Sequence, residues 1–313
     1  MDEPRLLHFG SAVVDFIYRI VHLPQPGDDL IASSFLQMPG GGFNMMVAAR
    51  RSGVKTVFMG RIGDGVAGSL LEKAFEQEKI DCLLPKIRGE DTGVCIVLVT
   101  GDGERTFVSH PGAESRLQAA DLQAIKTGPN DWFFTSGYTL AYPECGAQQA
   151  EFIAGLRPEQ TFVFDPTGIV GEIAPPILAS VLKRTDWLSC NRDEARTITG
   201  LVEPEAMADA LLNIHCPRSR GVVIRLGAEG AYLAERNQKL HFAPAFKVAT
   251  IDTNGAGDCH VGAFIAALMR GETPTFALRY ANASAALSTT KHGGATAPTR
   301  TEIDLLLTGT GEE

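Results

Sequence analysis

The sequence predicts an α/β protein whose central sheet is mostly parallel and is covered by helices on both faces. From about residue 131 onward, short β-rich runs are followed by helical patterns: TFVFD precedes PPILASVLKR, and DWLSC precedes RDEARTIT. Earlier in the chain, KTVFMG precedes GVAGSLLEKAFEQ in the same way. Alternation of strands and helices is typical of βαβ units, whose connecting helices pack on a parallel sheet.

Two segments, about 15–39 and 93–110, break this alternation and are predicted to be strands without an intervening helix. The second contains a hairpin signal, because GVCIVLV is followed by a GDGE turn and then by RTFVSH. We expect these strands to form a small sheet over one edge of the main domain, as a lid or as a subunit contact. The last third is predicted to be mostly helical, and residues 1–313 are expected to form one domain.

Composition and charge narrow the classes of partner. The chain has 28 Lys and Arg against 37 Asp and Glu, a net charge of -9, and no basic stripe, which disfavours a nucleic-acid partner. The six cysteines are scattered and form no C-x-x-C pair, which disfavours a zinc site and favours reduced thiols in the cytoplasm. No signal peptide or membrane span is expected, because no apolar run is long enough.

The most informative motif is IDTNGAGDCHVGAF, residues 251–264. A strand-like run, FKVATI, leads into it, and Gly255-Ala256-Gly257-Asp258 then opens an apolar helix. Glycines at a helix N-terminus leave backbone N–H groups free to bind an anion, with the helix dipole behind them. An aspartate beside a bound phosphoryl group is placed to act as a base toward an alcohol. The alternative is that Asp258 only complements the dipole, although the preceding residues already offer capping oxygens.

Three weaker motifs each allow two interpretations. Gly40-Gly41-Gly42 with Asn44 is an ordinary helix start, or a segment that admits a polyol to the backbone while Asn44 binds a hydroxyl. Asn191 and Glu194 fit a capping box, or face the water shell of a magnesium ion and the phosphates. Gly227 and Gly230 form a glycine turn or a nucleotide-facing loop.

Together and in this order, these motifs resemble the ribokinase/phosphofructokinase-B family of carbohydrate kinases over nearly the whole chain. Further matching segments are Gly10 and Asp15, Gly60-Arg61-Ile62-Gly63-Asp64, Thr92-Gly93, Gly103-Glu104-Arg105 and Asp165-Pro166. The resemblance implies a three-layer α/β/α ribokinase-like fold, a β-sheet lid that closes over the acceptor, and a homodimer built through that lid.

The resemblance also implies roles for individual residues. The positions that bind the acceptor are Asp15, Gly41, Gly42 and Asn44. The catalytic base is Asp258, and the anion hole for the transferring phosphoryl group is Gly255, Ala256 and Gly257. The nucleotide positions are Asn191, Glu194, Arg225, Gly227, Gly230 and Asn282, with Glu194 reaching Mg²⁺ through water. A monovalent cation, K⁺, would lie beside Asp252 and the Lys291–Gly294 turn.

The chain departs from the family pattern in three places. The Gly40–Asn44 segment is one residue shorter, Arg225 stands where a threonine is usual, and Ala141 aligns with a glutamate that ribokinases use on ribose. Arg105 on the hairpin is either a lid charge that reaches the active site or a solvated turn residue.

The expected function is therefore ATP-dependent phosphorylation of a hydroxyl on a small sugar or sugar-like molecule. The alternatives are a nucleoside kinase of the same fold and a non-catalytic regulator that binds a sugar or nucleotide. A Rossmann dehydrogenase is disfavoured, because GSAVVDFIYR follows the first predicted strand in place of G-x-G-x-x-G.

Overall fold

The computed structural model describes residues 3–309, and within them one sheet has nine strands in the order β13-β12-β11-β10-β9-β8-β1-β4-β5. The strands from β5 to β11 in this order pair in parallel, and β12 and β13 add an antiparallel edge. In chain order the strands are β1 (Arg5–His8), β4 (Lys55–Phe58), β5 (Asp81–Cys82), β8 (Trp132–Ser136), β9 (Thr161–Asp165), β10 (Trp187–Asn191), β11 (Gly221–Arg225), β12 (Gly230–Glu235) and β13 (His241–Pro244).

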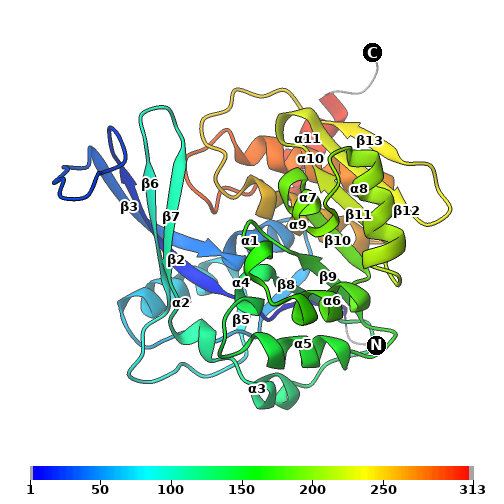
Figure 1. Ribbon diagram of the computed structural model, residues 1–313, viewed down its shortest axis with the longest axis horizontal. Helices are drawn as coiled ribbons and strands as arrows, with labels where there is room; N and C mark the ends of the chain where they lie inside the picture. The colour runs from blue at the N-terminus through cyan, green and yellow to red at the C-terminus, as the bar shows by residue number, and fades with distance from the viewer. Residues whose placement is uncertain (1–2, 310–313) are drawn as a thin grey trace.

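Helices cover both faces of this sheet (Figure 1). One face carries α1 (Gly42–Arg51), α2 (Val66–Glu78), α9 (Ala256–Met269), α10 (Pro274–Ser288) and α11 (Arg300–Gly309). The other face carries α3 (Ala119–Ala124), α4 (Gly137–Leu140), α5 (Gly146–Ala154), α6 (Pro175–Arg184), α7 (Arg192–Thr199) and α8 (Pro204–Ala210). The short helices are η1 (Ala113–Arg116), η2 (Val170–Glu172), η3 (Leu211–His215) and η4 (Gly227–Glu229).

Each central strand supplies both cores, because successive side chains point to opposite faces. Leu6 joins the α1/α9 core and Leu7 the α5/α6 core, and Phe134 and Phe133 are divided in the same way. This two-sided burial explains why the strands are continuous apolar runs instead of alternating patterns. The expected α/β architecture with helices on both faces is confirmed.

A second sheet of four strands, counted within residues 3–309, projects from one side of the body (left in Figure 1). Its order is β3-β2-β6-β7, with β2 (Ala12–Arg19), β3 (Ser34–Gly41), β6 (Val94–Val99) and β7 (Arg105–His110). The strands lie where the two irregular segments predict them, but β2 begins before residue 15 and β3 runs on to Gly41. We call this four-stranded sheet the lid.

One predicted element is wrong. The run FKVATI, residues 246–251, reads as a strand because of its β-branched and aromatic residues, but it has no regular structure. The last strand of the main sheet, β13, ends at Pro244 and forms its edge, so the next segment finds no partner ladder there. The segment instead carries the chain from the sheet to α9. The helices expected in the last third are present as α9, α10 and α11.

Candidate active site

The predicted functional residues gather where the parallel strands end and at the N-terminus of α9. Asp165 ends β9, Asn191 ends β10 and Arg225 ends β11. In open α/β sheets this carboxyl edge is where ligands bind, because the chain turns away there and leaves a crevice.

The start of α9 has the geometry of an anion hole. Gly255 adopts φ 74° and ψ 3°, the left-handed region, and an added Cβ would overlap the carbonyl oxygen of Gly294. Only glycine fits this position without strain. The first intrahelical bond comes from the Cys259 N–H, at 2.8 Å from the Gly255 oxygen, and within residues 3–309 we find no backbone acceptor for the N–H groups of Gly257 and Asp258. The predicted anion hole of Gly255, Ala256 and Gly257 is changed in one respect, because the Ala256 N–H donates to the Thr253 oxygen at 3.3 Å. The two donors available to an anion, at the positive end of a 14-residue helix, are thus the N–H groups of Gly257 and Asp258.

Asp258 lies beside these donors and faces the predicted acceptor residues. Its Oδ2 accepts from Asn44 Nδ2 at 3.4 Å, and Asn44 Oδ1 is buried without a partner among the described residues. Burial, reinforced by the Asp165 charge, raises the pKa of Asp258 to about 7. Burial and the charge of Asp258 raise the pKa of Asp15, from the lid, to about 7 as well. An aspartate with a raised pKa, next to an amide with a free acceptor, is suited to bind and deprotonate a hydroxyl.

The glycines that precede Asn44 make room for the protein's own side chains. An added Cβ at Gly40 would overlap the Asp15 carboxyl, and one at Gly42 would overlap the His8 ring. Gly41 has φ 60° and is the residue from which α1 begins. These glycines therefore hold Asp15 and the start of α1 close together, in addition to any contact they make with a ligand.

A buried arginine links two carboxylates on the nucleotide side. Arg225 Nη1 donates to Asp165 Oδ2 at 2.9 Å and to Ser189 Oγ at 2.6 Å, and Nη2 donates to Glu194 Oε2 at 3.5 Å. Burial alone would lower the pKa of Arg225, but the charges of Asp165 and Glu194 outweigh it and raise that pKa. Burial and the charge of Asp165 raise the pKa of Glu194 to about 7. The guanidinium lies about 4 Å from where a Cβ of Gly257 would be, so its charge is next to the anion hole.

Asn191 and Glu194 form the predicted capping box at the start of α7. Asn191 Oδ1 accepts from the Glu194 N–H at 2.9 Å, and Glu194 Oε2 accepts from the Asn191 N–H at 2.7 Å. The structural interpretation of this motif is thus confirmed. The same Glu194 carboxylate contacts Arg225, so the two residues also belong to the site.

The other residues predicted to bind the nucleotide are Asn282, Gly230 and Gly227. Asn282 is buried, donates to the carbonyls of Ala243 and Pro244 at 3.0 and 3.1 Å, and pairs with His260. Gly230 has φ 127°, and an added Cβ would overlap the Ala243 carbonyl. Gly227 has φ 59° with open space around it. Of these residues, Gly227 is the one with room for a ligand beside it.

Arg105, on strand β7 of the lid, contacts the body. It pairs with Asp252, and its Nη1 donates to Thr253 Oγ1 at 3.0 Å. Its side chain is 19% exposed, so it is not a solvated turn residue in this structure. On the opposite strand of the lid, Met38 Sδ accepts from the Gly294 N–H at 3.4 Å. The lid therefore rests on the residues that flank the anion hole.

Two residues of the site, Asp165 and His8, received no role from the sequence. Asp165 belongs to a segment that matches the family, and its place directly after a buried strand indicates a carboxylate at the sheet edge. His8 is fully buried beneath Gly10 and Gly42, and burial lowers its pKa to about 4. A neutral histidine there packs the junction between body and lid.

Two absences concern the described part of the chain. Between residues 3 and 309, no group of three or more His, Cys, Asp or Glu side chains is arranged to hold a metal ion. In the same stretch no helix combines the length and apolarity needed to cross a membrane.

The comparison with known proteins agrees with this geometry. The model of the pfkB family carbohydrate kinases matches residues 3–301. An uncharacterized sugar kinase of Escherichia coli K12, YegV, is 31% identical over 297 residues, which are 94% of this chain and 91% of that protein. The ribokinase structure from Thermotoga maritima has a TM-score of 0.83 at 25% identity and covers 98% of this chain and 100% of that one.

A further solved structure shows the ligands of one relative. The Arabidopsis thaliana ribokinase complexed with ribose and ATP has a TM-score of 0.80 at 25% identity, over 98% of this chain and 99% of that one. Fold, site geometry and family match thus agree, and the chain belongs to the pfkB family of carbohydrate kinases.

Proposed function

We propose that the protein transfers the γ-phosphate of ATP to a hydroxyl of a small sugar or sugar-like molecule, with Asp258 as the general base. The observation that carries this proposal is the pairing of a free helix N-terminus with a partly buried carboxylate beside it, facing Asn44 and Asp15. The Arabidopsis ribokinase, which has a similar fold and binds ribose and ATP, supports the same pair of substrates.

In the proposed reaction, the acceptor hydroxyl lies between Asp258 and the terminal phosphoryl group. Its proton passes to the Asp258 carboxylate as the new O–P bond forms, and the bond between the γ-phosphorus and the bridging oxygen breaks to release ADP. The N–H groups of Gly257 and Asp258 stabilise charge on the phosphoryl oxygens. Asn44 and Asp15 orient the acceptor, and the lid excludes water that would otherwise be phosphorylated in its place.

Mg²⁺ fits the acidic side of this site. The carboxylates of Asp165 and Glu194 are the hard oxygen donors that Mg²⁺ accepts, and Arg225 already donates to both, so we propose that Glu194 reaches the ion through water. When bound, Mg²⁺ neutralises charge on the phosphates.

Potassium does not fit Asp252 in the same way. The Asp252 carboxylate accepts from Arg105, from the Asn254 N–H at 2.9 Å and from the Gly293 N–H at 3.2 Å. The Arg105 guanidinium pairs with this carboxylate and competes with a cation bound directly to it, whereas Glu194 is proposed to reach Mg²⁺ only through water. We therefore assign no step to potassium.

We propose that residues 1–313 work as one kinase unit and that two copies pair through the outer face of the lid. Phe35, Ile96 and Val108 lie on that face and are 51%, 38% and 58% exposed. Exposed apolar side chains gathered on one sheet face favour a protein partner, and a second copy presents the same face. Light scattering should give a dimer for the wild type and a monomer for Val108→Glu; a monomeric wild type would refute the pairing.

A cytoplasmic site of action is part of the same proposal. All six cysteines lie within the described residues, and all six are free thiols, five of them buried. Disulfides form in oxidising compartments, so six unpaired thiols favour a reducing one.

The test of the function is ADP release from ATP in the presence of a panel of pentoses, hexoses, sugar acids, sugar phosphates and nucleosides. We expect acceptor-dependent ADP release together with a phosphorylated product detected by mass spectrometry. Turnover confined to nucleosides would establish the nucleoside kinase alternative. Binding of a sugar or nucleotide without turnover of any acceptor would establish the regulator.

A further inference from the structure

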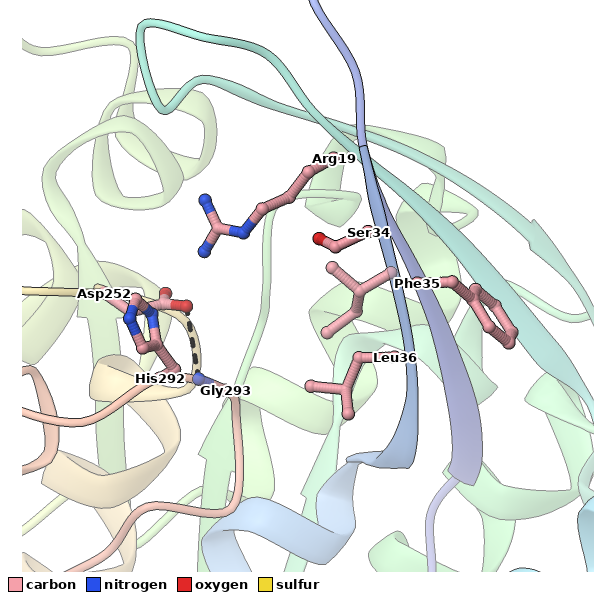
Figure 2. Close-up of a pocket in the computed structure, with 8 residues that line it drawn as sticks. Arg19, Ser34, Phe35, Leu36, Asp252, His292 and Gly293 are labelled. Carbon is pink, nitrogen blue, oxygen red and sulfur yellow. Dashed lines mark hydrogen bonds between the residues drawn. The ribbon is translucent and has the colours of Figure 1, made fainter. Parts of the chain in front are cut away.

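A cavity of about 240 Å³ lies between the lid and the body, outside the residues assigned so far to the acceptor (Figure 2). It is lined by Ile17, Arg19, Ser34, Phe35, Leu36, Asp252, His292 and Gly293. Figure 2 shows the Arg19 guanidinium reaching from the lid toward Asp252 and His292 on the body, whereas the Phe35 ring points to the other side of the strand. The cavity thus has a lid wall and a body wall, and both carry polar side chains.

The cavity and the predicted acceptor site share one face of the lid. On β2, side chains two residues apart point to the same side, so Asp15, Ile17 and Arg19 form one row. Their partners on β3 are Met38, Leu36 and Ser34, which form a second row beside the first. The inner end of these rows faces Asp258, and the outer end lines the cavity. Arg19 lies four positions after Asp15 along the strand, a rise of about 13 Å.

The charged side chains in the cavity wall are Arg19 on the lid and Asp252 on the body. Among residues 3–309 we find no hydrogen bond or ion pair for the Arg19 side chain. The one carboxylate in the cavity wall, Asp252, is already paired with Arg105 and accepts from the N–H groups of Asn254 and Gly293. Two guanidinium groups therefore face a single carboxylate, and His292 adds a further polar ring.

The two ends of the rows have opposite electrostatic character. Asp15 and Asp258 make the inner end acidic, and an anionic group would be repelled there. Arg19 makes the outer end basic, and a carboxylate or phosphate would form a charge-assisted hydrogen bond with it. Between them, Ile17 and Leu36 present apolar surface to a carbon skeleton. Met38, whose unbranched thioether adapts its shape readily, lies between the cavity and Asp15.

We propose that this cavity is the distal part of the acceptor site and that it binds an anionic group, a carboxylate or a phosphate, carried by the acceptor at the end remote from the reacting hydroxyl. The inference rests on the proposed kinase function and names its substrate class. Arg19 is the residue that would select such an acceptor. The acidic inner end and basic outer end would also fix its direction, with the hydroxyl toward Asp258.

The experiment compares matched acceptors with wild type, Arg19→Gln and Arg19→Lys. Each neutral sugar is tested beside its acid and its phosphate, for example glucose with gluconate and fructose with fructose 6-phosphate. Arg218→Gln is the control variant, because it removes the same charge from an exposed position. Arg218 lies shortly before the first residue of β11, at the end of that strand remote from Arg225. Thermal unfolding of all variants verifies that each one folds.

We expect the wild type to prefer one anionic acceptor to its neutral counterpart by 10-fold or more in kcat/KM. In Arg19→Gln, the KM for the anionic acceptor should rise ~10- to 100-fold more than the KM for the neutral one, as expected for loss of a hydrogen bond between charged groups. Arg19→Lys should recover part of this difference, and Arg218→Gln should show none. Comparison of the sugar acids with the sugar phosphates shows whether the cavity binds a carboxylate or a phosphate.

Direct titration of the same acids and phosphates, without ATP, separates the two possible failures. Turnover with no difference between anionic and neutral acceptors in Arg19→Gln would overturn the cavity proposal and leave the kinase intact. Binding that depends on Arg19 without any turnover would support the cavity and refute the kinase. Binding of free inorganic phosphate that does not compete with the acceptor would show an independent ion site and also overturn the proposal.

Discussion

The body and the lid contribute different kinds of chemical group to the same proposed site. On the body, the proposed anion hole consists of backbone N–H groups held by a glycine in a left-handed conformation, and Asp258 and Arg225 lie partly buried beside it. On the lid, Asp15, Arg19 and Arg105 project from a sheet whose outer face and far end are exposed. In the proposed mechanism the body carries out the phosphoryl chemistry, whereas the lid offers side chains that can change with little effect on the fold. Such a division would allow the acceptor contacts to change while the phosphoryl chemistry stays the same.

The largest effect on activity, and the strongest test of this difference between body and lid, is expected from removing the proposed base, Asp258. Asp258→Asn should lower kcat by ~10² or more, because general-base catalysis contributes effects of that size. KM for ATP should change little, since the helix N-terminus that binds phosphate is retained. Steady-state kinetics on the folded variant provide the measurement. Near-normal turnover would remove Asp258 from its proposed role.

A second large effect, on stability instead of rate, is expected at Arg225. Arg225→Thr would restore the residue type usual in the family but leave Asp165 and Glu194 without their partner. Loss of one member of a buried ion pair costs about 3–5 kcal/mol, so the free energy of unfolding in urea should fall by an amount of that order. Arg225→Lys should recover part of the loss. An unchanged free energy of unfolding in Arg225→Thr would mean that the cluster adds nothing to the body.

The pH dependence of activity should report the ionisation of Asp258 together with that of Asp15, whose pKa the charge of Asp258 helps to raise. Asp258 must be ionised to accept a proton, and its pKa is about 7, so kcat/KM should rise as the pH increases through 7 and level off above it. A pH–rate profile with a neutral acceptor measures this. A flat profile between pH 5 and pH 9 would show that the base is another group.

Stability should change with pH in the opposite direction. Asp15 and Asp258 bind protons more tightly in the folded protein, where their pKa values are about 7, than in the unfolded chain, where they are near 4. Their stabilising effect is therefore complete below pH 4 and is lost as the pH rises toward 7. Relative to the wild type, Asp15→Asn should gain stability at pH 8, on the order of a few kcal/mol at most. Urea unfolding at pH 5 and pH 8 tests this, and equal differences at both values would contradict it.

The smallest effect belongs to the lid contact. Arg105→Ala removes the pair with Asp252 and the hydrogen bond to Thr253, which are partly exposed. We expect KM for the acceptor to rise ~3- to 10-fold, as the loss of about 1 kcal/mol of contact implies. Unchanged KM values for both substrates would show that this contact does not help to close the site.

The sequence predicted the elements whose signal is local. The glycines before Asp258, the capping box at Asn191 and the irregular segments of the lid all carry their information in adjacent residues. The strand predicted for FKVATI failed because local β propensity says nothing about whether a partner strand is available. The partners of Arg225 could not be predicted either, since Asp165, Ser189 and Glu194 meet it only through the order of the strands. The row from Asp15 to Arg19 likewise needs the observed register of β2 on β3.

The junctions between lid and body have a mechanical consequence. Only Phe9, Gly10 and Ser11 separate β1 from β2, and β3 passes directly into α1 at Gly42. A swing of the sheet would therefore drag the carboxyl group of Asp15 and the first turn that bears Asn44 along with it. Binding contacts with the sugar and the exclusion of water would therefore be gained or lost together, in a single movement. An acceptor too large for the sheet to cover would also lose these contacts. The way the sheet is connected to the body therefore disfavours hydrolysis of ATP without phosphorylation of an acceptor.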